Sequence, residues 1–185
     1  MDERYPRRTP FFLMQALKEE VERITDDMCF MKPRNPEADP EYVKMQVFEQ
    51  ALPIPKKNVR AGGVALETID YLDENTEDTV YGCPWAVVKA DAGKIPGVNA
   101  NQNVTVAVCF GIFNDSTENN GHQEILNLIQ RVYERFAKDP ILAGSYTCTC
   151  EFEWALQDED TYPYYFGAIG MSFEFMGIRR ENRFV

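Results

Sequence analysis

Apolar and polar residues alternate most regularly between residues 104 and 112, where valine, phenylalanine and isoleucine occupy every second position. Successive side chains of a strand point to opposite faces, so this spacing predicts a strand with one strongly apolar face. The same period recurs in residues 148–156 and 165–175. These two segments are also predicted to be strands, and they become partners if the polar segment 157–163 forms the turn between them.

Residues 121–138 follow a helical period instead. Their apolar positions form one stripe and their charged positions form the opposite face, which predicts an amphipathic helix that ends before Asp139 and Pro140. The stripe consists of Ile125, Leu128, Ile129, Val132 and Phe136.

A second helix is predicted near the start of the chain. Thr9 can cap its N-terminus and Pro10 suits the first helical position. The apolar residues that follow at helical spacing are Leu13, Leu17, Val21 and Ile24. Residues 32–41 contain three prolines and no periodicity, so they are expected to form a loop or linker.

The alternation of apolar and polar residues is less regular between residues 42 and 103. Residues 43–55 and 61–73 each resemble a short strand, joined by a basic turn region, and residues 73–79 form an acidic loop. Residues 84–91 predict another strand. A long loop containing Gly93, Pro96 and Gly97 is expected to follow it.

These elements predict an α+β fold. The C-terminal half has the order β–β–α–β–β, and its helix buries its apolar stripe only by lying across one face of an antiparallel or mixed sheet. A chain of 185 residues is long enough for one domain with its own core. We expect residues 1–41 to form the N-terminal helix and proline-rich linker, and 42–185 to form the main sheet with its helix at about 121–138.

Charge and composition narrow the function classes. The formal net charge is −11, from 30 acidic and 19 basic residues, which disfavours sequence-specific binding of nucleic acid. The sequence contains no apolar run of the roughly 18 residues that a membrane helix needs, and its N-terminus lacks the apolar centre of a signal peptide. A cytoplasmic protein is therefore expected, and its five cysteines imply no disulfide framework.

The sequence contains few candidate catalytic or metal-binding residues. His122 is the single histidine, and no serine or cysteine is placed beside it by any known nucleophile motif. Cys148 and Cys150 are predicted to share the core face of their strand with Phe152 and Trp154, rather than to bind a metal. The sequence thus predicts no catalytic residue, no metal site and no cofactor.

Two surface features remain as candidate sites. Glu151 and Glu153 lie opposite the apolar face of their strand and are expected to face solvent. The start of the last strand is crowded with aromatic residues, which could line a ligand pocket, fill the core or contact another subunit. No polar groups converge there, so we favour a subunit contact, with core packing as the alternative. Its aromatic residues are Tyr162, Tyr164, Tyr165 and Phe166.

Five segments, in this order, resemble a known group of proteins: PWAVVKADAG, VTVAVCFGIFND, GHQEILNLIQRVYERF, FEWALQDEDTYPYYFGAIGMSFEF and the closing GIRRE. They are similar to small tail proteins of tailed phages and prophages, in particular the tail-terminator or tail-completion group. The resemblance covers roughly residues 80–180. It rests on ordered segments and on no catalytic signature, and the first 80 residues depart from the smallest members.

The resemblance implies a compact subunit that assembles into a homo-oligomeric ring, commonly a hexamer, at the head-proximal end of the tail tube. Its implied partners are the tail-tube and head–tail connector proteins, and DNA only as the passing genome; it implies neither cofactor nor catalysis. Glu151 and Glu153 are then candidates to face the channel, where negative charge would repel DNA. A head–tail joining or other minor tail protein remains an alternative. So does a different class, either a small-molecule-binding module or a bacterial adaptor.

Overall fold

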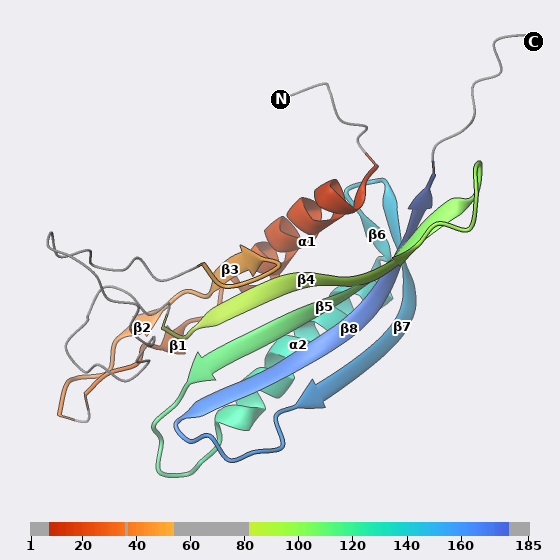
Figure 1. Cartoon of the computed structure of the whole chain (residues 1–185). Coiled ribbons are helices and arrows are strands. Elements are labelled where there is room, and N and C mark those ends of the chain that lie inside the picture. The colour runs from red at the N-terminus through yellow and green to blue at the C-terminus, as the bar shows by residue number, and fades with distance from the viewer. Residues whose placement is uncertain (1–7, 36, 54–81, 178–185) are drawn as a thin grey trace, which may run out of the picture.

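The computed structural model describes residues 8–35, 37–53 and 82–177. These residues form two helices, a two-stranded sheet and a six-stranded sheet (Figure 1). The helices are α1 (Pro10–Thr25) and α2 (Gly121–Lys138). The strands are β1 (Phe30–Met31), β2 (Tyr42–Val43), β3 (Gln46–Glu49), β4 (Trp85–Lys94), β5 (Asn101–Phe113), β6 (Ile141–Leu142), β7 (Tyr146–Leu156) and β8 (Tyr164–Met176).

The large sheet is mixed and has the order β3-β4-β5-β8-β7-β6. Only β3 and β4 run parallel; the remaining neighbours are antiparallel. The central pair, β5 and β8, stays in register from Asn101 opposite Met176 to Phe113 opposite Tyr164. The predicted α+β class is confirmed, and so is the predicted partnership of residues 148–156 with 165–175, because β7 pairs with β8.

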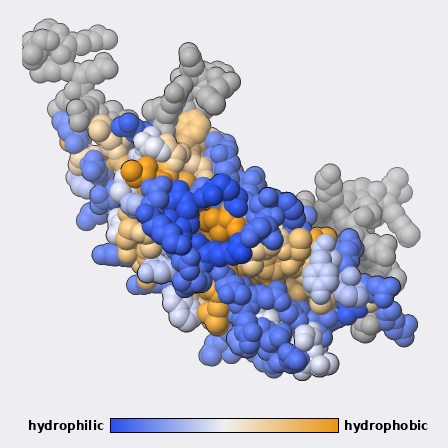
Figure 2. Space-filling model, turned by 180° about the vertical axis from the view of Figure 1, so that it is seen from behind, coloured by the Kyte–Doolittle hydropathy of each residue, from blue (hydrophilic) through white to orange (hydrophobic). Residues whose placement is uncertain are grey.

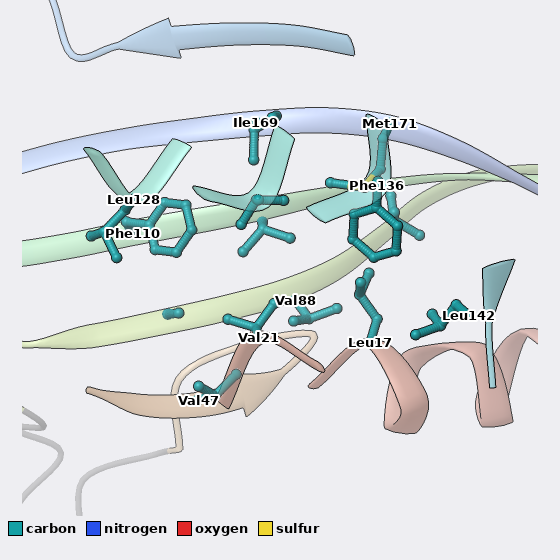
Figure 3. Close-up of a cluster of buried hydrophobic side chains, with 14 of the residues drawn as sticks. Leu17, Val21, Val47, Val88, Phe110, Leu128, Phe136, Leu142, Ile169 and Met171 are labelled. Carbon is teal, nitrogen blue, oxygen red and sulfur yellow. The ribbon is translucent and has the colours of Figure 1, made fainter. Parts of the chain in front are cut away.

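Both helices pack against the same face of this sheet (Figure 1). The predicted face of β5, at positions 104, 106, 108, 110 and 112, is at most 4% exposed, and the stripe of α2 is buried against it. Figure 3 shows the resulting core, in which Leu17 and Val21 of α1 and Leu128 and Phe136 of α2 meet side chains of the sheet. Phe136 also packs edge to face with Phe173, with ring centroids 5.3 Å apart.

Polar contacts join the two helices at the edge of the core. The carboxylate of Glu20 accepts hydrogen bonds from Arg23 in its own helix and from Arg135 in α2. Arg131 donates to Asp27 at 2.5 Å, just after α1. Burial acts to raise the pKa of Glu20, but the two arginines outweigh it and hold that pKa below its ordinary value. Glu20 is therefore ionised and paired at neutral pH.

The N-terminal helix starts as predicted. The hydroxyl oxygen of Thr9 accepts a hydrogen bond from the backbone N–H of Phe12 at 3.3 Å, and Pro10 occupies the first turn. The proline-rich residues after β1 form a loop that returns to β2, which pairs with β1. No period indicated β1, which has only two residues. The strand predicted over 43–55 is divided in the structure: Val43 belongs to β2, and only Gln46–Glu49 form β3.

One predicted strand boundary is wrong, and two predicted segments fall outside the residues that the structure describes. β4 runs to Lys94, so Gly93 is part of the strand and not of the following loop, which is correspondingly shorter than predicted. An irregularity in pairing between Ala90 and Ala92 changes the alternation, and this explains why the sequence pattern ended early. The predicted strand at 61–73 and the acidic loop at 73–79 lie outside the described residues.

Candidate functional site

The large sheet has a second face, opposite the two helices. Because α1 and α2 pack on the other side, neither described helix covers this face (Figure 1). We call it the uncovered face. The strand register assigns to it alternate residues of the four longest strands, including Trp85, Gly111, Phe166, Thr105 and Ser172.

Aromatic rings occupy one end of the uncovered face. Trp85, Gly111 and Phe166 are neighbours on three adjacent strands, and the rings of Trp85 and Phe166 lie 5.9 Å apart between centroids. A Cβ at position 111 would lie 2.5 Å from the Trp85 indole, so only glycine leaves room for this ring. Phe113 and Tyr164 form a second, edge-to-face pair at 5.3 Å.

The middle of the uncovered face carries short side chains. Ala107 and Cys109 of β5 lie opposite Gly170 and Ala168 of β8, and all four are partly exposed. The hydroxyl groups of Thr105 and Ser172 are hydrogen-bonded at 3.2 Å farther along. This face therefore combines aromatic rings at one end with a low, weakly polar surface in the middle, which suits contact with another protein surface better than binding of a small polar molecule.

The aromatic residues at the start of β8 do not all lie on the same face of the sheet. Tyr164 and Phe166 point to the uncovered face, whereas Tyr165 lies on the helix side against Gly121, where a Cβ would overlap its ring. The Tyr165 hydroxyl donates to the side-chain oxygen of Asn119, and Tyr162 donates to the backbone oxygen of Asp115 at 3.0 Å. Tyr162 and Tyr164 remain 47% and 39% exposed. Core packing thus accounts for much of Tyr165, and the other rings stay available for contact.

Strand β7 departs from the predicted alternation in its first half. Cys148 pairs with Phe173, but Phe152 pairs with Met171, so β7 bulges between them and Cys150 has a positive φ of 60°. Cys148 is buried and Cys150 is exposed. The prediction that both cysteines lie in the core is therefore wrong for Cys150, although its thiol stays on the helix side of the sheet, 3.8 Å from the backbone oxygen of Phe136 in α2. Glu151 and Glu153 are exposed, as expected.

Trp154 has the predicted orientation but not the predicted burial. It pairs with Ile169, which faces the helices, yet its side chain is 59% exposed. The reason is the order of the sheet: β7 lies next to the edge, and α2 lies mainly across β8 (Figure 1). The prediction that Trp154 is a core residue is wrong, although Phe152 beside it is partly buried.

A groove runs between α2 and β7 and has a volume of about 600 Å³. Tyr133 forms one wall and packs edge to face on Phe152 at 5.2 Å. Tyr133 is itself 43% exposed. Sequence reasoning missed this groove; the available signal was Tyr133, an aromatic residue at the border of the apolar stripe of α2. We call it the α2/β7 groove; it is lined by Leu126, Asn127, Ile129, Gln130, Tyr133, Cys150, Phe152, Trp154 and Ile169.

Two of the five cysteine thiols, those of Cys83 and Cys148, are buried. Burial raises the pKa of Cys148 to about 11 and that of Cys83 to about 12, so both thiols stay protonated at neutral pH and are weak nucleophiles. His122 is exposed at the start of α2. Within residues 8–35, 37–53 and 82–177, no group of three or more His, Cys, Asp or Glu side chains is arranged to hold a metal ion. Neither α1 nor α2 is long and apolar enough to cross a membrane.

One carboxyl group in the first turn of α2 is perturbed. Burial raises the pKa of Glu124, and a hydrogen bond from the side-chain nitrogen of Asn114, at 2.7 Å, partly opposes the rise. Asn114 is 8% exposed and also accepts from the backbone N–H of Ser116. Because Asn114 shapes the turn between β5 and α2, we assign this pair a structural role.

Comparison with known proteins gives no further assignment, since the sequence matches no protein-family model and no curated protein.

Proposed function

We propose that this chain is a structural subunit of a phage or prophage tail, and that it forms the terminator or completion ring at the head-proximal end of the tail tube. The observation that carries the proposal is the uncovered face of the sheet, with Trp85, Tyr164 and Phe166 at one end. Aromatic residues on a face without helical cover are typical of protein contacts. The ordered resemblance of residues 80–180 to tail proteins supports the same assignment.

A ring requires each subunit to present two different surfaces to its neighbours. The chain offers a broad sheet face and, separately, the α2/β7 groove beside a strand edge. The interface candidates Tyr164 and Phe166 belong to the first surface. Tyr162 precedes β8 and donates its hydroxyl hydrogen to the backbone oxygen of Asp115, and Tyr165 lies on the helix side. A subunit with two such surfaces can join neighbours head to tail, which closed rings need.

The acidic residues have a role in this proposal. Glu151 and Glu153 are exposed on β7, and the whole chain carries a net charge of −11. If these two glutamates face the channel, their charge repels the DNA backbone and keeps the genome from adhering during passage. The protein would act in the tail or neck of the virion and assemble in the cytoplasm of the bacterial host. No cofactor takes part.

A head–tail joining protein or another minor tail protein has the same structural requirement and is the nearest alternative. The groove is the observation on which an adaptor function outside the virion would rest, because it offers an apolar site to another chain.

Sedimentation equilibrium of the full chain tests the proposal, alone and with the tail-tube protein of the same phage or prophage. We expect concentration-dependent growth to a closed oligomer, or ring closure on the tube. A chain that stays monomeric under both conditions contradicts the proposal. Capsid and tail-tube genes beside this gene would provide independent support.

A further inference from the structure

The six-stranded sheet has two stretches of backbone edge that no described strand covers. β3 covers the outer edge of β4 only along residues 85–88, and β6 covers that of β7 only at residues 146–147. Among the described residues, no strand lies against the outer edge of β4 at 92–94 or of β7 at 152–156. Backbone N–H and C=O groups on such an edge can accept a further strand.

On β7, the free backbone groups belong to Phe152, Trp154 and Leu156. The N–H of Gln157 points inward, since it donates to the backbone oxygen of Phe166 in β8 at 3.0 Å. Successive residues of a strand direct their N–H and C=O groups to opposite sides, so residues 152, 154 and 156 direct theirs outward. The side chains of Phe152 and Trp154 line the α2/β7 groove. On this helix side, Figure 2 shows hydrophobic areas between larger hydrophilic ones.

On β4, the free backbone groups include those of Gly93. The N–H and C=O groups of Ala90 point outward and bond to the side-chain amide of Gln50. The pairing of β4 with β5 then skips Asp91, so the alternation shifts by one residue and Gly93 points outward. In a strand that continues to Ile95, that residue points outward too.

The charges beside the two edges are opposite in sign. Lys94 is the single charged residue between positions 92 and 100, and the preceding Asp91 pairs with Lys89 at 3.7 Å. Glu151 and Glu153 are the charged residues between positions 148 and 157. Among the described residues, no ion pair includes Lys94 or either glutamate. The edge of β4 therefore presents an unpaired cation, and the edge of β7 presents two unpaired carboxylates.

The lysine and the glutamate lie on the same face of the sheet. Lys94 is opposite Asn103 of β5, on the uncovered face. Glu153 is opposite Gly170 of β8, on that same face. Ile95 follows Lys94, takes the helix side in an extended chain, and is 71% exposed. Each edge thus combines charge on the uncovered face with an exposed apolar side chain for the helix side.

One antiparallel register matches the two edges in three residue pairs. On the uncovered face a cation meets a carboxylate, and on the helix side an aliphatic side chain meets an aromatic ring while a glycine leaves room for an indole. In both helix-side pairs the backbone groups of the two residues point toward each other, as hydrogen-bonded pairs require. The three pairs are Lys94 with Glu153, Ile95 with Phe152, and Gly93 with Trp154.

The stepped outline of the sheet accommodates this register. Lys94 is level with Glu174 of β8, and Glu153 is level with Gly170. Pairing Lys94 with Glu153 therefore displaces neighbouring sheets by four residues along the strands, about 14 Å. β3, which is level with residues 166–169 of β8, then lies past the end of the next copy's β7. β6 of that copy lies past the end of β4 for the same reason.

We infer that the edge of β4 at residues 92–95 of one copy pairs with the edge of β7 at residues 152–156 of the next copy. Within one molecule β5 and β8 separate these strands, so the partner is a second copy (Figure 1). This inference rests on the proposed function, since it names the contact between neighbouring subunits. Two different edges make a head-to-tail contact, which closes into a ring when the rotation allows.

Cross-linking of the full chain tests this contact. Lys94→Cys and Glu153→Cys are introduced together, because opposite residues of a non-hydrogen-bonded pair have Cα atoms about 4.5 Å apart, within the range of disulfides. Diamide oxidises the two thiols, with and without tail-tube protein present. Peptide mapping by mass spectrometry should then find a disulfide between positions 94 and 153, which can form only between copies.

The matched control carries Lys94→Cys with Glu151→Cys. Position 151 is exposed on the same strand but lies in the bulge, outside the register. Its cross-linked fraction should be at least fivefold lower. Equal cross-linking at positions 151 and 153 overturns the inference, because it indicates random collision of exposed thiols.

Charge reversal provides a test without new cysteines. Lys94→Glu and Glu153→Lys should each raise the dissociation constant for self-association about fivefold, since each places like charges opposite one another. An equimolar mixture of the two variants should recover the wild-type value, because alternating copies restore every pair. Glu19→Lys, on the exposed side of α1, is the control and should change little. Two variants that associate as tightly as wild type overturn the inference.

Failure of the inference and failure of the proposed function give different results. A wild-type ring without the disulfide between positions 94 and 153 overturns the inference and leaves the proposed ring standing. A disulfide that joins copies into open chains, with no closed ring in sedimentation, supports the inference and contradicts the ring.

Discussion

Trp85 and Phe166 lie ring to ring on the uncovered face of the sheet, with centroids 5.9 Å apart and Gly111 between them on the middle strand. The missing side chain at Gly111 makes this contact possible, because the indole occupies the space where a Cβ would stand. The contact therefore fixes the aromatic end of the surface that we assign to subunit assembly.

Gly111→Ala should displace the indole and destabilise the fold by about 1–3 kcal/mol, as overpacking does. Urea unfolding followed by tryptophan fluorescence measures both the loss and the changed environment of Trp85. Gly97→Ala is the matched control, since no atom lies within 4 Å of its added Cβ. Equal stability of the two variants would show that the indole does not lie against Gly111.

Trp154→Ala should cost less than about 1 kcal/mol, because 59% of this side chain is already exposed. A tryptophan in the core would cost about 3–5 kcal/mol. Phe173→Ala is the control: Phe173 is 0% exposed and packs on Phe136, so its loss should fall in the larger range. A Trp154 variant as unstable as the Phe173 variant would mean that α2 covers the end of β7.

The two outcomes for Trp154 show what a period in the sequence can and cannot predict. Alternation gave the orientation of Trp154 correctly, and the helical stripe predicted α2 with the bounds that it has. Burial depends in addition on the order of the strands and on where α2 crosses them. Neither is encoded in a local period, since both result from pairing between distant segments.

Irregular backbone limited the prediction in a similar way. Cys150 lies in the bulge of β7 and is exposed, and β4 continues past its pairing shift at Ala90 to Lys94. A local pattern assumes an uninterrupted pleat, so it does not show where a strand bulges or where its pairing shifts. The α2/β7 groove was missed for a different reason: its walls come from a helix and a strand, and the local sequence does not give their relative placement.

Glu20→Gln should lower the free energy of unfolding by about 1 kcal/mol at neutral pH, since it weakens the charge-assisted bonds from Arg23 and Arg135. The folded-state pKa of Glu20 lies below its ordinary value of 4.5. The stabilisation is therefore present above that value and is lost as pH falls through the lowered pKa. Urea unfolding across this range should show the difference from wild type closing. Glu19→Gln, which is exposed on the same helix, should show little effect at any pH.

Glu124→Gln should raise the free energy of unfolding at neutral pH, by up to about 1 kcal/mol. Burial raises the folded-state pKa of Glu124, so its ionised form is disfavoured in the folded protein, whereas glutamine keeps an oxygen to accept from Asn114. The advantage should shrink as pH falls toward that raised pKa, because wild type then becomes neutral too. Lower stability of the variant at neutral pH would mean that the N-terminus of α2 favours the charge more than burial penalises it.

The central claim is that copies of this chain close into a ring. Electron microscopy of the purified full chain, alone and after addition of tail-tube protein from the same phage or prophage, tests it most directly. The account predicts averaged particles with rotational symmetry and a central hole, formed either in solution or at the end of the tube. Particles of single chains in both preparations, with no density capping the tube, would contradict it.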